Sequence, residues 1–83
     1  MIKGFTKAEA QNCLDRCGDD EPVFLLRAQD VNFCPTVAAW GMLTIIAADK
    51  ESNTTGAEKA QDRLEGLHHV TNWQAVNHTK VAD

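Results

Sequence analysis

Apolar residues recur every three or four positions in three stretches of the chain, a spacing that places side chains along one face of an α-helix. The first stretch opens with the capping-box sequence TKAE, in which Thr6 is the N-cap, and predicts a helix over residues 7–17. The last opens with a similar sequence, TGAE, in which Thr55 is the N-cap, and predicts a helix over residues 56–71. Mixed charges cover the other face of this last helix, as expected at a protein surface.

The middle stretch differs because its sequence VAAWGMLTIIAA, residues 37–48, has no charged side chain. Pro35 suits the first turn of a helix, so the pattern predicts a helix over residues 35–49. A helix that is apolar all round is expected to be buried on all sides. Two neighbouring helices in so small a domain cannot cover every side, so we expect another molecule to cover the rest. The apolar positions are Val37, Trp40, Gly41, Thr44 and Ala48 on one side and Met42, Ile45 and Ile46 on the other.

The run VFLLR, residues 23–27, is too short for periodicity to decide between a strand and a helix. A strand needs a partner strand for its backbone N–H and C=O groups. Within the chain only the N-terminal sequence IKGF or the C-terminal tail can serve, and otherwise the partner is the same segment of a second copy. The tail, residues 74–83, has no pattern and is expected either to fray or to dock on a partner.

Together these patterns predict a single domain over residues 1–83 with a mainly α fold, built from three helices and one short extended segment. The alternative is an α+β fold in which the extended segment pairs across a dimer. A domain of this size buries only about 60% of the surface that its unfolded chain exposes. Oligomerisation is a common way for such a small domain to gain stability.

Charge and composition narrow the classes of partner. The chain has 8 Lys and Arg residues against 12 Asp and Glu, a net charge of −4, and no basic cluster. This balance is unfavourable for binding nucleic acid or an anionic membrane, because both attract positive charge. The charge-free run is also shorter than the roughly 20 residues of a membrane helix. Since the N-terminus lacks the apolar run of a signal peptide and the three cysteines are an odd number, we expect reduced thiols and a cytoplasmic protein.

The cysteines and one histidine are the candidate metal ligands. Cys13 and Cys17 lie four residues apart on the first predicted helix, so their sulfur atoms point the same way. Cys34 and a histidine, either His68, His69 or His78, would complete a tetrahedral zinc set. Structural zinc sites usually take their cysteine pairs from a turn, so we favour small core residues as the role of these thiols. A small zinc-binding domain remains the alternative.

No catalytic motif stands out. His68 and His69 could act as ligands or as a general base, but the helix dipole alone also favours imidazoles near a helix C-terminus. No serine lies in a nucleophile elbow, and the glycines form no phosphate-binding loop. We therefore expect a protein that is not an enzyme and that has no cofactor.

The run GDDEPVFLLRAQD, residues 18–30, is followed by Trp40. This arrangement resembles a group of small uncharacterised bacteriophage and prophage proteins, in which a short helix precedes an E-P-x-F-x-L-R-A-x-D-like motif and a helix with a Trp follows. The resemblance covers residues 18–40 and implies a phage origin but no activity. By analogy with small acidic phage proteins, it also implies a host protein as target, with this chain as an inhibitor of host defence or transcription.

Protein binding is therefore the function that we expect. Tryptophan often dominates binding interfaces, and Trp73 lies beside polar residues near a helix end, where it suits a surface anchor. A symmetric homodimer is the main prediction for the partner, and a host protein is the second. Acidic residues at the rim are expected to contribute selectivity. The predicted interface residues are Trp40, Met42, Ile45, Ile46 and Trp73.

Overall fold

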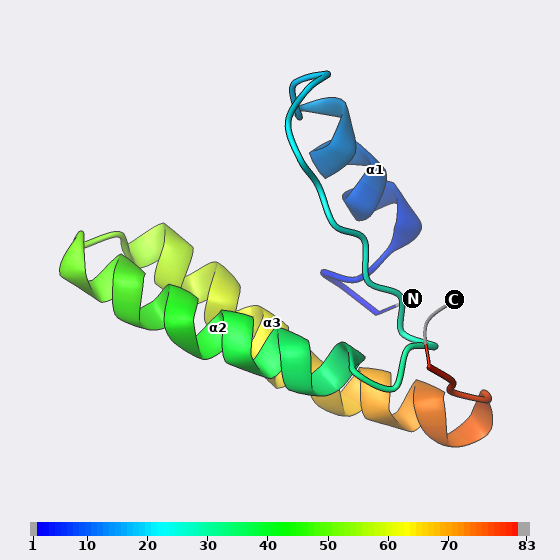
Figure 1. The fold of residues 1–83 in the computed structure, drawn as a ribbon. Coiled ribbons are helices and arrows are strands. Elements are labelled where there is room, and N and C mark those ends of the chain that lie inside the picture. The colour runs from blue at the N-terminus through cyan, green and yellow to red at the C-terminus, as the bar shows by residue number, and fades with distance from the viewer. Residues whose placement is uncertain (1, 82–83) are drawn as a thin grey trace.

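Three helices follow one another along the chain, and two of them form the body of the molecule. The computed structural model describes residues 2–81. Helix α1 spans Lys7–Asp15, α2 spans Phe33–Lys50 and α3 spans Thr54–Val76. Helices α2 and α3 pack side by side as a hairpin, whereas α1 stands away from them (Figure 1). The predicted mainly α fold with three helices is confirmed.

Helix α1 begins at the predicted cap and ends two residues early. The Thr6 hydroxyl accepts a hydrogen bond from the Glu9 N–H at 3.2 Å, and the Glu9 carboxylate accepts one from the Gly4 N–H at 2.9 Å. At the other end, the N–H groups of residues 16 and 17 donate to carbonyls three positions back. These bonds tighten the last turn, so the regular α-helix ends at residue 15.

A short loop joins α2 to α3 and completes the hydrogen bonds of both helix ends. Ser52 has a positive φ of 55° and its N–H donates to the Asp49 carbonyl at 3.2 Å, while the Asn53 N–H donates to the Ala48 carbonyl at 2.8 Å. This is the Schellman pattern that closes a helix. The side chain of Asn53 then accepts from the Gly56 N–H at 2.9 Å and caps α3.

The cap of α3 is thus Asn53, and the prediction of Thr55 as the cap is wrong. We expect Asn53→Ala to lower the free energy of unfolding by about 1 kcal/mol, because the Gly56 N–H loses its acceptor. Urea denaturation followed by circular dichroism measures the change. Thr55→Ala is the matched control and should change the free energy by less than about 0.5 kcal/mol. The assignment fails if the two substitutions cost the same.

The core of the hairpin is small. Gly41 lies in α2 against Leu64 of α3, where the absence of a side chain lets the two helices approach closely. Few large apolar side chains are excluded from water, so the described chain covers only part of its apolar surface. The buried apolar residues are Phe33, Ala48, Ala60 and Val70.

The N-terminal turn connects α1 to the hairpin. The ring of Phe5 lies edge-on to the ring of Phe33, with 5.6 Å between their centroids. On the α3 side, the guanidinium of Arg63 lies 5.9 Å from the centroid of the Phe5 ring. Gly66, also in α3, leaves room for the same ring. Phe5 therefore anchors this end of the chain, while α1 itself buries no residue.

Helix α3 continues to Val76, past the predicted end at residue 71, and part of the tail docks. The Lys80 N–H donates to the Gln29 carbonyl at 2.8 Å, and the Val31 N–H donates to the Lys80 carbonyl at 3.0 Å. These bonds form an isolated parallel bridge between Asp30 and Lys80. The tail predicted to fray or to dock on a partner therefore continues α3 as far as residue 76 and docks on its own chain at residue 80. Residues 82–83 lie outside the described chain.

Candidate functional site

The outer face of α2 is an uncovered apolar feature of the described chain. Met42, Leu43 and Ile46 are 61%, 67% and 53% exposed, and they follow the exposed Ala39 at positions i+3, i+4 and i+7. Trp40, 48% exposed, lies at the edge of this face. We call these five residues the α2 surface. No charged residue occurs in α2 before Asp49, so the surface is neutral.

The packing of α3 explains why the outer face of α2 is exposed to solvent. Helix α3 contacts the side of α2 that carries Phe33, Gly41 and Ala48, which are the buried residues of α2. Ile45 is only partly exposed because it flanks the side that contacts α3. It therefore contributes less to the outer face than Trp40, Met42 and Ile46, the other interface residues predicted on this helix. Leu43 was missed by the sequence prediction, although its spacing from Ala39 is the signal that could have found it.

A second uncovered feature is the extended segment, residues 21–27, which leads from the end of α1 toward α2 (Figure 1). It contains neither a helix nor a strand, so neither reading of residues 23–27 is borne out within one chain. Within residues 2–81, the backbone groups of residues 22–26 make no hydrogen bond. Val23, Phe24 and Leu25 are 58%, 85% and 64% exposed. This segment therefore exposes both its apolar side chains and its peptide groups.

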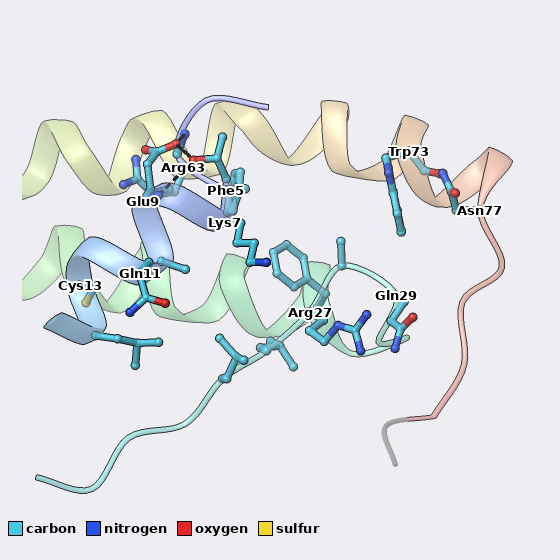
Figure 2. A pocket seen from close by; sticks show the side chains of 18 of the residues that line it. Phe5, Lys7, Glu9, Gln11, Cys13, Arg27, Gln29, Arg63, Trp73 and Asn77 are labelled. Carbon is cyan, nitrogen blue, oxygen red and sulfur yellow. Dashed lines mark hydrogen bonds between the residues drawn. The ribbon is translucent and has the colours of Figure 1, made fainter. Parts of the chain in front are cut away.

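An open cleft of about 1180 Å³ lies between α1, the extended segment and the hairpin (Figure 2). Lys7 and Arg27 line it, and neither is in an ion pair within the described chain. Glu9 is the carboxylate of its lining, and hydrogen bonds from the Thr6 hydroxyl and the Gly4 N–H lower its pKa. The cleft is therefore cationic, although the whole chain is acidic. Its apolar lining is Phe5, Ala10, Leu14, Leu25, Leu26, Ala28, Phe33 and Trp73.

Trp73 takes part in this cleft rather than in the α2 surface. Its side chain is 38% exposed and points from α3 toward the cleft (Figure 2). The α3 helix continues for a further turn beyond it, and the Asn77 amide donates to the Trp73 carbonyl at 2.8 Å. The predicted interface residues are therefore divided between two surfaces of the molecule.

The structure does not bring the candidate zinc ligands together. Cys34 lies beside α3, with its Sγ 3.5 Å from the Gln74 side-chain oxygen. The Cys17 thiol lies at the end of α1, where it donates a hydrogen bond to the Cys13 carbonyl. Burial, and after it a hydrogen bond from the thiol to the Glu21 carboxylate, raises the pKa of the Cys17 thiol and disfavours the thiolate that binds metal. Among residues 2–81, no group of three or more His, Cys, Asp and Glu side chains could hold a metal ion.

The two adjacent histidines are exposed on α3 and do not line the cleft. The His68 and His69 rings lie 3.8 Å apart between centroids, and His68 Nδ1 lies 2.6 Å from the Glu65 carbonyl oxygen. Both residues are exposed to solvent, and within the described chain their rings contact each other and the Glu65 carbonyl, so the position of the pair offers no support for a general base.

Comparison with protein-family models, curated proteins and solved structures finds no match to this chain. In the described part of the chain, no helix is both long enough and apolar enough to cross a membrane. The candidate functional features of the described chain are therefore its two uncovered surfaces and the cleft.

Proposed function

We propose that this chain is a non-enzymatic protein-interaction module that places its α2 surface in an apolar groove of another protein. The exposure of Met42, Leu43 and Ile46 on an uncharged helix face is the observation that carries the proposal. Exposed apolar patches rimmed by polar residues often mark such contacts. Burying one of these side chains fully contributes about 1.5–3 kcal/mol.

The geometry of the surface favours a groove as its complement. Ala39, Met42, Leu43 and Ile46 have the i, i+3, i+4, i+7 spacing by which a helix inserts anchors into a hydrophobic groove. The surface is convex because its residues lie on one side of a single helix. An uncharged groove suits it, since a charged one would leave its own charges buried and unpaired.

The cleft of a second copy is a poor complement. It is lined by Lys7, Arg27 and Arg63, and the α2 surface offers no carboxylate to pair with them. The acidic residues Asp49 and Glu51 lie at one end of the helix, where they can orient an approaching partner. If the chain is phage-encoded, as its resemblance implies, the groove belongs to a host protein.

Leu43→Glu tests the proposal. A carboxylate at the centre of the α2 surface should weaken target binding at least tenfold, because it removes buried apolar area and buries a charge. The assay is affinity capture from lysate of cells that naturally contain the chain, with quantitative mass spectrometry. A photo-crosslinking residue at position 42 then identifies the contacted protein.

Val76→Glu is the matched control, because Val76 is 84% exposed and lies outside the α2 surface and the cleft. The same target should be recovered with wild type and with Val76→Glu, and lost with Leu43→Glu. Circular dichroism verifies that each variant is folded. Equal recovery with all three proteins would contradict the proposal, as would a position-42 crosslink to a second copy alone.

A further inference from the structure

The extended segment has the features of an unpaired β-strand. Its peptide groups from residue 22 to residue 26 have no hydrogen-bond partner in the described chain, and its central side chain, Phe24, is the most exposed large apolar residue there. Exposed, unpaired strands readily pair with another strand. The required complement is therefore a second extended segment.

We infer that residues 21–27 pair antiparallel with the same residues of a second copy, with Phe24 facing its own counterpart on the two-fold axis. In this register Glu21 of each chain faces Arg27 of the other, and Val23 faces Leu25. Opposite charges and apolar pairs in directly facing positions stabilise an antiparallel sheet. The sequence EPVFLLR is thus complementary to itself in charge and in apolar character.

The proline fixes which facing pairs exchange hydrogen bonds. Pro22 has no N–H, so it belongs at a position whose N–H points away from the partner strand. Val23 and Leu25 then exchange backbone hydrogen bonds with each other across the axis. Phe24 lies in a non-hydrogen-bonded pair, in which facing side chains come closest. At the outermost pair, the Arg27 N–H donates to the Glu21 carbonyl of the second copy. The reciprocal bond is not formed, because the Glu21 N–H already donates to the Gly18 carbonyl at 3.1 Å.

Charge identifies the second copy as the occupant. Arg27 and Lys7 line the cleft beside this segment and have no ion pair within the described chain. In the antiparallel register, the acidic turn at residues 19–21 of the second copy arrives next to Arg27. The α2 surface has no comparable charge pattern. The pairing uses none of its residues, so the dimer carries two free α2 surfaces and is bivalent toward a target.

A charge swap tests the register. Arg27→Glu places two carboxylates opposite each other at both ends of the pairing, and Glu21→Arg places two guanidinium groups there. Each variant alone should dimerise at least about tenfold more weakly than wild type, whereas an equimolar mixture should form a heterodimer of near wild-type affinity, because every facing pair is again opposite in charge. Analytical ultracentrifugation measures both. Lys59→Glu, on the exposed face of α3, is the control and should dimerise as wild type does.

A crosslink tests the centre of the pairing. Phe24→Cys, in a chain whose three native cysteines are replaced by serine, should form a covalent dimer on mild oxidation, because facing residues of a non-hydrogen-bonded pair lie within disulfide distance. Val76→Cys in the same background is the control and should remain largely monomeric. Three results would overturn the inference. The wild type could be monomeric, the two charge variants could fail to form a heterodimer when mixed, or Phe24→Cys and Val76→Cys could crosslink equally. A dimer that Leu43→Glu dissociates and Arg27→Glu leaves intact would also overturn it, since self-association would then belong to the α2 surface.

Discussion

Phe33→Ala is expected to lower the free energy of unfolding by about 3 kcal/mol or more, because it removes the largest buried apolar side chain of a small core. Phe33 is 6% exposed, and its ring contacts the Phe5 ring that anchors the N-terminal turn. A loss of this size is comparable with a large part of the total stability of a domain this small. Thermal and urea denaturation, followed by circular dichroism, measure it.

Phe24→Ala is the matched control for this prediction. It makes the same chemical change at a residue that is 85% exposed. At a protein concentration low enough to keep the chain monomeric, its cost should stay within about 0.5 kcal/mol. Similar losses at the two positions would show that Phe33 is not part of the core of this fold.

Gly41→Val is expected to cost about 2–3 kcal/mol, because the two packed helices leave no space for a side chain at this position. An ideal Cβ on Gly41 lies 2.6 Å from Leu64 Cδ2 and 2.8 Å from Leu64 Cγ. The clash cannot be relieved by the end of the Leu64 side chain alone, since its branching carbon is also too close. The helices must move apart, and the change is measured by urea denaturation.

Ala39→Val separates this clash from the lower helix propensity of a β-branched residue. Ala39 lies on the exposed face of the same helix, so its substitution should cost less than about 0.7 kcal/mol. If Gly41→Val costs no more than Ala39→Val, the close approach of α2 and α3 at Gly41 is refuted.

The helices could be predicted because their signals are local. The Thr6 capping box and the apolar spacing located α1, and the charge-free run located α2. The N-terminus of α3 was misplaced because TGAE at residues 55–58 has the capping pattern, yet the cap is Asn53. The chain reaches Asn53 through the Schellman turn at Ser52, and that geometry depends on how α2 ends.

The exposed surfaces were less predictable. Periodicity identified two apolar sides on the central helix, but it could not say which side would face a neighbour. The contact of Gly41 with Leu64 shows that α3 takes one side, which leaves Met42, Leu43 and Ile46 uncovered. Trp73, predicted as a surface anchor, instead lines the cleft together with Phe5 of the N-terminal turn and Leu26 of the extended segment.

The amino-acid sequence by itself determined the helical composition and the excess of apolar area over what three short helices can cover, because both follow from the order and type of the side chains. Only the tertiary structure decided where that excess lies. Phe5 packs on Phe33 and holds the N-terminal turn, so α1 and the extended segment project from the hairpin. Helix α3 covers one side of α2, and the opposite side stays in contact with water. Such placements depend on contacts between residues far apart in the chain, which local patterns do not encode.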